Sequence, residues 1–151
     1  LDKKRKMSEF QIFVCEDDNW YADFLKYQIE LNPDFLVKKF LSGKDLISSL
    51  HLQPNAITLD YSLPDFNGED LVEIIKKESP NTEIIIISGQ NDISVALNLI
   101  KNGVFDYLAK DNDIKERLWN TLLKINKQGK LKEKIEKLSQ EVSKKYDFSL
   151  H

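Results

Sequence analysis

The chain has 151 residues, of which 41% are hydrophobic, so it is long enough for one domain with a packed core and a short additional segment. Its formal net charge of -3 argues against non-specific attraction of the whole chain to nucleic acid. Cys15 is the single cysteine, and no group of Cys and His has zinc-binding spacing, which excludes an intrachain disulfide and a structural zinc site.

The opening segment, LDKKRK before Met7, is basic and too short to fold by itself. We assign residues 1–8 to a leader or a disordered N-terminus. This segment lacks the apolar core of a signal peptide, and no apolar run in the chain reaches the roughly 18 residues of a membrane span. Together with the lone cysteine, these features predict a cytoplasmic protein with no membrane partner.

Apolar runs alternate with helical patterns along the rest of the chain. The apolar runs are nearly continuous in three cases, as expected for a parallel sheet covered on both faces, and the more mixed second run is expected nearer an edge. In chain order, we predict a strand at Phe10–Cys15, a helix at Trp20–Leu31, a strand at Phe35–Phe40, a helix at Asp45–Leu50, a strand at Ala56–Asp60, a helix at Glu69–Ser79, a strand at Glu83–Ser88, a helix at Ile93–Asn102, a strand at Phe105–Ala109 and a helix from Ile114 onward.

This order predicts an α/β fold, a (βα)5 doubly wound sheet of five parallel strands followed by a C-terminal helical linker. Ser42 and Asn67 are expected to cap the second and third helices. In a doubly wound sheet, right-handed crossovers place the ligand site at the carboxyl ends of the strands.

Polar residues occupy four of these strand ends and are expected to converge. Carboxylates that lie close together repel each other unless a cation lies among them, and a site made only of oxygen ligands favours Mg²⁺. Such a site, with a nearby lysine and hydroxyl group, could accept a phosphoryl group on a carboxylate. The converging residues are Glu16, Asp17, Asp60, Ser88 and Lys110.

From Phe10 to Lys127 the chain resembles the receiver (CheY-like) domain of two-component response regulators. The resemblance rests on the paired acids in CEDD, on Asp60 in ITLDYSLPDFNG, on Ser88 before a glycine and on Lys110 in YLAKDND. It implies a phosphoprotein that takes a phosphoryl group from a sensor histidine kinase and is not an enzyme acting on free metabolites. The self-catalysed reactions would be phosphotransfer to the domain and its own dephosphorylation.

The resemblance also implies a role for each residue. Asp60 would be the nucleophile, Asp17 a direct Mg²⁺ ligand, Glu16 a ligand through water or a positioning group, the Ser62 carbonyl a further ligand, Lys110 the partner of the phosphoryl group, and Ser88 with Tyr107 the switch pair.

Asp18 is expected only to face solvent or to cap the next helix. The family usually has proline after this lysine, whereas here Asp111 follows, so we expect a trans bond and a loop that differs locally from its relatives.

The last helix carries two apolar series. Ile114, Leu118, Leu122 and Ile125 have helical spacing, and Leu131, Ile135, Leu138 and Val142 continue at alternating steps of four and three. We divide the chain into a receiver at 9–127 and a coiled-coil linker at 128–151 that makes a homodimer. A single solvated helix is the alternative.

The final segment, EVSKKYDFSLH, resembles the junction to the ATPase domain in NtrC-like, sigma-54-dependent activators. The sequence has no GxxxxGK[ST] loop, so DNA contact would need a domain that is absent from this chain. We therefore predict the receiver part of a transcription activator, with a stand-alone receiver as the alternative. A haloacid-dehalogenase-type phosphohydrolase is disfavoured because it needs an acid at the position of Ser62.

Overall fold

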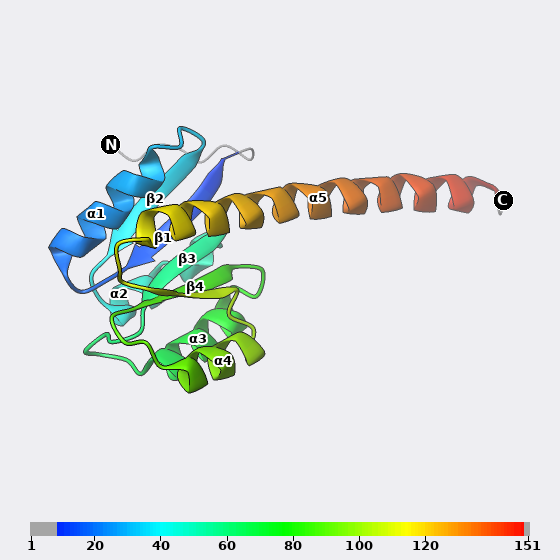
Figure 1. Ribbon diagram of the computed structural model, residues 1–151. Helices are drawn as coiled ribbons and strands as arrows, with labels where there is room; N and C mark the ends of the chain where they lie inside the picture. Colours follow the sequence, from blue (N-terminus) through cyan, green and yellow to red (C-terminus); the bar gives the residue numbers. More distant parts are fainter. Residues whose placement is uncertain (1–8, 150–151) are drawn as a thin grey trace.

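The computed structural model describes residues 9–149, so the basic opening segment and His151 lie outside the described residues. One sheet of five parallel strands forms the centre of the molecule (Figure 1). Its strand order β2-β1-β3-β4-β5 confirms the predicted doubly wound α/β fold and places the mixed second strand at an edge. The strands are β1 (Phe10–Cys15), β2 (Phe35–Phe40), β3 (Ala56–Asp60), β4 (Glu83–Ser88) and β5 (Asp106–Ala109).

Helices cover both faces of this sheet (Figure 1). α1 and α5 pack on one face, and α2, α3 and α4 pack on the other. The predicted helices all form, with ends within two residues of the expected positions. Their bounds are α1 (Asn19–Glu30), α2 (Gly43–Ser48), α3 (Gly68–Glu78), α4 (Ile93–Lys101) and α5 (Ile114–Ser149), with a short 3₁₀ helix at Leu50–Leu52.

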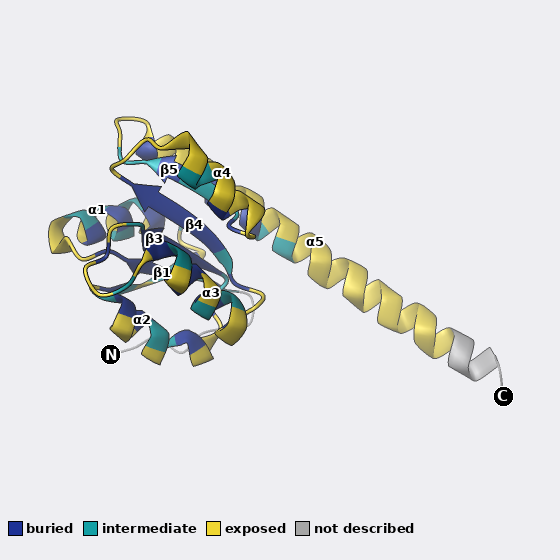
Figure 2. Ribbon diagram, turned by 90° about the horizontal axis from the view of Figure 1, so that it is seen from below, coloured by how far each residue is buried: buried dark blue, intermediate teal, exposed yellow. Residues whose placement is uncertain are grey.

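The central strands are buried on both faces, which explains their continuous apolar sequence (Figure 2). Ile85 and Ile87 of β4 pack toward α1 and α5, whereas Ile84 and Ile86 pack into the second core on the opposite face. Successive side chains of a strand point to opposite faces, so one apolar run supplies both cores.

Side-chain caps set where the helices begin. Ser42 Oγ accepts a hydrogen bond from the Asp45 N–H, and α2 therefore begins two residues before its predicted start. Asn67 caps α3 in the same manner, as predicted. Asp18 is exposed, and its carboxylate accepts from the N–H groups of Trp20 and Tyr21, which confirms that it caps α1.

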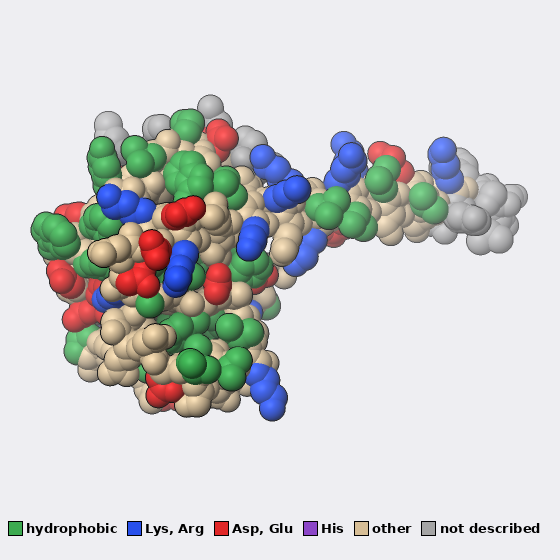
Figure 3. All heavy atoms as spheres, in the orientation of Figure 1, with side chains coloured by type: hydrophobic (Ala, Val, Ile, Leu, Met, Phe, Trp, Pro, Cys, Tyr) green, Lys and Arg blue, Asp and Glu red, His purple; other side chains and the backbone are tan. Residues whose placement is uncertain are grey.

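α5 is one continuous helix that leaves the body of the molecule and projects well beyond it (Figure 1). Its first series, from Ile114 to Ile125, is buried against the sheet. Beyond Gly129 the helix carries exposed apolar side chains among lysines and glutamates (Figure 3). Within residues 9–149, no helix combines the length and the apolar character that crossing a membrane requires.

Candidate functional site

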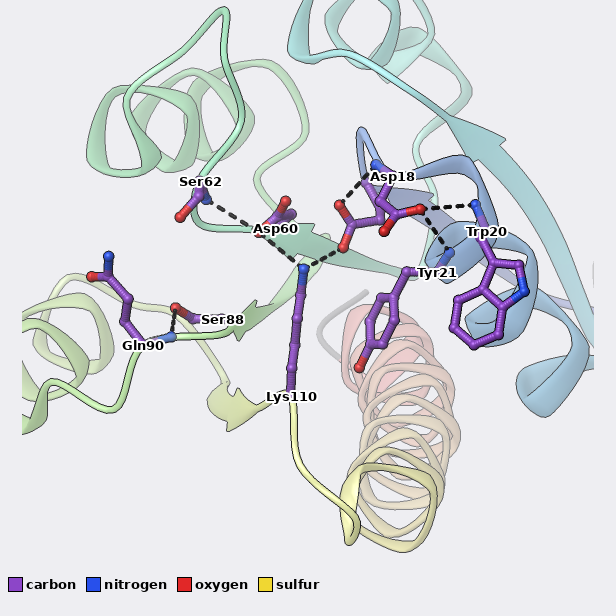
Figure 4. Close-up of polar contacts among 9 residues, drawn as sticks. Asp18, Trp20, Tyr21, Asp60, Ser62, Ser88, Gln90 and Lys110 are labelled. Carbon is purple, nitrogen blue, oxygen red and sulfur yellow. Dashed lines mark hydrogen bonds and ion pairs between the residues drawn. The ribbon is translucent and has the colours of Figure 1, made fainter.

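The carboxyl ends of β1, β3 and β5 bring the predicted acids and the lysine together. Figure 4 shows Asp60 and Lys110 at these strand ends. Glu16 and Asp17 directly follow β1, Asp60 ends β3, and Lys110 directly follows β5. One carboxylate oxygen from each of the three acids lies within 4.8 Å of the others. The doubly wound topology therefore builds the predicted cluster from segments that are far apart in the sequence.

Lys110 places its ammonium group against two of these acids. Its Nζ lies 2.5 Å from Glu16 Oε1 and 3.6 Å from Asp60 Oδ1 (Figure 4). Burial would lower the pKa of Lys110, but the hydrogen bond to Glu16 and the charge of Asp60 outweigh it and raise that pKa above its usual value. Lys110 is therefore a fixed positive charge at the strand ends.

Glu16 is the most buried of the three acids, with 2% of its surface exposed. Burial, followed by the hydrogen bond to Asp60, raises the pKa of Glu16 to about 7, although the hydrogen bond from Lys110 acts in the opposite direction. Both of its carboxylate oxygens are engaged, because Lys110 donates to Oε1 and the Asp18 N–H donates to Oε2 at 3.2 Å. Glu16 is thus held in place rather than available for reaction.

The donor set fits a hard divalent cation. Three carboxylates with no His or Cys among the described residues of the cluster supply only oxygen, and their mutual repulsion is relieved when a cation binds. Asp17 is exposed, so the site is open to solvent on that side, as Mg²⁺ requires for the waters it retains.

Asp60 is presented by a strand that is buried along its whole length. Its side chain is 6% exposed, and Oδ1 accepts a hydrogen bond from the Ser62 N–H at 3.2 Å. The loop after Asp60 is held tightly, because a Cβ added to Gly68 would lie 2.5 Å from the Tyr61 ring. The Tyr61 hydroxyl also donates to Glu69 at 2.6 Å. The Ser62 N–H therefore orients the Asp60 carboxylate, and the loop beyond it is closely packed.

The two residues of the predicted switch pair, Ser88 and Tyr107, both bond to the backbone of one residue, Gln90. Ser88 is fully buried at the end of β4, and its Oγ accepts from the Gln90 N–H at 3.0 Å (Figure 4). The Tyr107 hydroxyl donates to the Gln90 carbonyl, also at 3.0 Å. Ser88 and Tyr107 are therefore both hydrogen-bonded to Gln90, a residue that the sequence did not single out.

Tyr21 is a second residue that sequence reasoning missed. The Lys110 ammonium lies over its ring, 4.7 Å from the ring centroid. Tyr21 is in the first turn of α1, directly after the acids, so the helical period could have suggested that it turns toward the strand ends. The peptide bond from Lys110 to Asp111 is trans, as predicted, since residues 9–149 contain no cis peptide bond.

The fold and the acidic site together define a phospho-accepting signalling domain, and sequence comparison agrees. The profile of the response regulator receiver domain family matches residues 12–135, so the chain belongs to this family.

Individual relatives include a transcriptional regulator and a regulatory protein. The DNA-binding transcriptional regulator NtrC of Proteus hauseri is 32% identical over 113 residues, which cover 74% of this chain and 24% of that protein. The regulatory protein LuxO of Vibrio cholerae is 31% identical over 117 residues, or 76% of this chain and 26% of that protein. The chain thus spans about a quarter of the length of these two curated relatives.

A solved structure with the same fold is the signal receiver domain of a putative LuxO repressor protein from Vibrio parahaemolyticus. It superposes with a TM-score of 0.78 at 27% identity, and the match covers 84% of this chain and 97% of that one.

Proposed function

We propose that this chain is a cytoplasmic receiver that accepts a phosphoryl group from a sensor histidine kinase on Asp60 and thereby activates transcription through an attached output domain. One observation carries the chemistry. The Lys110 ammonium lies between Glu16 and Asp60 at the strand ends, where the three carboxylates also converge. This arrangement combines a nucleophile with a site for a cation and a fixed positive charge.

The reaction is an in-line transfer. A carboxylate oxygen of Asp60 attacks the phosphorus of a phosphohistidine, the nitrogen–phosphorus bond breaks, and its electron pair stays on the imidazole nitrogen. Lys110 is close enough to move from Glu16 toward the incoming phosphoryl oxygens. Glu16, Asp17, Asp60 and the Ser62 carbonyl would hold Mg²⁺, which when bound supplies charge neutralisation for the phosphoryl group.

The switch would act through the segment between β4 and α4. The Ser88 hydroxyl accepts from the Gln90 N–H before phosphorylation and could donate to a phosphoryl oxygen afterwards. Because Tyr107 donates to the carbonyl of the same residue, the phosphoryl group would bias the position of Tyr107 as well. The surface of α4 and β5 would report this shift to the rest of the protein.

The output domain is inferred from two features. One relative named above is a DNA-binding transcriptional regulator and another is a regulatory protein, and the projecting part of α5 carries a heptad pattern suited to a linker. Homodimerisation through this helix would connect the receiver to the output. Reading the coding sequence beyond His151 separates this proposal from a stand-alone receiver, because only an activator would continue into an ATPase loop and a DNA-binding region.

The phospho-accepting activity can be tested directly. Incubation of the protein with acetyl phosphate and Mg²⁺ should add one phosphoryl group that hydroxylamine removes, as expected for an acyl phosphate. The same incubation with a chelator should leave the mass unchanged. Equal labelling with and without Mg²⁺ would contradict the proposed cation site.

Asp17→Asn should weaken Mg²⁺ binding by roughly tenfold or more, because it removes one charged oxygen ligand. Asp18→Asn is the matched control. It makes the same charge change one residue away, and an Asn side chain can still accept from the N–H groups of Trp20 and Tyr21 that Asp18 caps. Mg²⁺ titration by calorimetry measures both affinities. Equal losses in the two variants would mean that the direct ligand has been assigned to the wrong residue.

A further inference from the structure

We propose that Tyr21 is a positioning residue, whose ring face holds the Lys110 ammonium at the point where the phosphoryl group reaches Asp60. This inference rests on the proposed function. Its basis is the contact of Lys110 Nζ with the Tyr21 ring at 4.7 Å from the centroid (Figure 4). An ammonium group within about 6 Å of a ring face is attracted by the quadrupole of the ring.

Glu16 holds the ammonium in the structure, so the lysine needs a second restraint once the ammonium turns from Glu16 toward the phosphoryl group. The Lys110 N–H donates to the Ser88 carbonyl at 2.9 Å, and the next residue, Asp111, donates to Ala109 at 2.9 Å. Proline would limit the backbone after the lysine, but this chain has Asp111 there. Four methylene groups separate the Lys110 backbone from its ammonium. A neighbouring side chain therefore has to limit the movement of the ammonium.

Tyr21 is well placed to be that neighbour. The N-cap that starts α1 also fixes Tyr21, because Asp18 Oδ1 accepts the Tyr21 N–H at 3.3 Å. The Tyr21 ring is half-buried against the core formed with α5, and Phe24 packs beside it at 5.5 Å between ring centroids. The position of the ring is therefore set by its own neighbours and does not depend on the lysine.

A ring face suits a charge that must change partners. During phosphotransfer the ammonium has to leave Glu16, at 2.5 Å, for the phosphoryl group on Asp60. A carboxylate in place of Tyr21 would hold the ammonium in one ion pair, and an aliphatic side chain would desolvate it without compensation. The attraction to a ring face is weaker than an ion pair, so it keeps the charge in the site without holding it to one carboxylate.

The ring, and not the hydroxyl, is the active part. The hydroxyl lies on the side of the ring away from Asp60 (Figure 4). It is buried and makes no hydrogen bond to any residue that the structure describes. Tyr21→Phe should therefore keep the effect on Lys110, whereas Tyr21→Leu should remove it. Leu stays apolar but is smaller than Tyr, so the loss of packing has to be measured separately.

The test measures phosphorylation by acetyl phosphate as a function of donor concentration. Tyr21→Leu should lower the maximal rate constant by about fivefold with little change in the half-saturating concentration, and Tyr21→Phe should stay within about twofold of the wild-type protein. Tyr27→Leu, an exposed tyrosine on the same helix, is the control and should change neither value.

A double-mutant cycle separates positioning from packing. In a Lys110→Met background, Tyr21→Leu should have no further effect on the rate, because the group that it positions is gone. An equal loss in both backgrounds, together with a lower melting temperature, would reduce Tyr21 to a packing residue and overturn the inference.

A second readout does not depend on phosphorylation. In protein labelled with ¹³C-lysine, the Cε–H resonance of Lys110 should be shifted upfield by the Tyr21 ring current, in the wild-type protein and in Tyr21→Phe but not in Tyr21→Leu. An unshifted wild-type resonance would refute the contact while leaving Asp60 phosphorylation untouched. A shifted resonance in a protein that is not phosphorylated would instead refute the proposed function, and with it the positioning role.

Discussion

Asp60→Asn is expected to abolish phosphorylation of the chain by acetyl phosphate. An amide has no carboxylate oxygen to attack phosphorus, and the neighbouring acids cannot take over the reaction. Both oxygens of Glu16 already accept hydrogen bonds, from Lys110 and from the Asp18 N–H. Asp17 is exposed. The ion pairs of Lys110 with the three acids are with Glu16 and Asp60, so Asp17 is not the acid beside the positive charge.

The fold should survive this substitution, because the carbonyl oxygen of the new amide side chain can still accept the Ser62 N–H. Mass spectrometry of the wild-type protein and of the variant gives the phosphoryl adduct, and Asp70→Asn is the control because it makes the same change at an exposed position of α3. The control should be labelled like the wild-type protein. An undiminished, hydroxylamine-labile adduct in Asp60→Asn would place the nucleophile elsewhere.

The fold was predictable because each element carries a local signal. β3 and β4 are buried on both faces, so their sequences are continuous apolar runs, and the side chains of Asp18, Ser42 and Asn67 mark helix starts. The ends of the elements were less predictable. β5 starts at Asp106 and not at Phe105, because strand ends depend on pairing with a neighbour that the local sequence does not specify.

The site was predictable as far as topology determines it. Parallel strands place their carboxyl ends at one edge, so Glu16, Asp60 and Lys110 could be brought together from sequence alone. The contact between Tyr21 and Lys110 and the bridge through Gln90 could not. Both depend on side-chain and loop positions in space, and a tyrosine in a helix has the same local signal whether it packs in the core or under an ammonium group.

The projecting part of α5 carries apolar side chains that the described residues leave exposed. Its four apolar side chains lie on one stripe and are exposed by 57% at Leu131, 58% at Ile135, 52% at Leu138 and 52% at Val142. Leucine alternates with β-branched residues along this stripe, which is the arrangement that favours parallel two-stranded coiled coils. A second copy of the chain would cover the stripe.

Leu138→Asp is expected to turn a weakly associating dimer into a monomer. About half of each seam side chain is already covered, so burying the rest contributes on the order of 1 kcal/mol per side chain, which is comparable to the loss of freedom on association. With so small a surplus, one carboxylate buried in the seam is enough to prevent pairing.

Gln140→Asp puts the same charge on the outer side of the helix and should leave the association unchanged. Sedimentation velocity over a range of protein concentrations, with and without phosphorylation, gives the dissociation constants of all three proteins. If the wild-type chain stays monomeric at high micromolar concentration in both states, α5 ends in a solvated single helix, and the output must be controlled through the receiver surface alone.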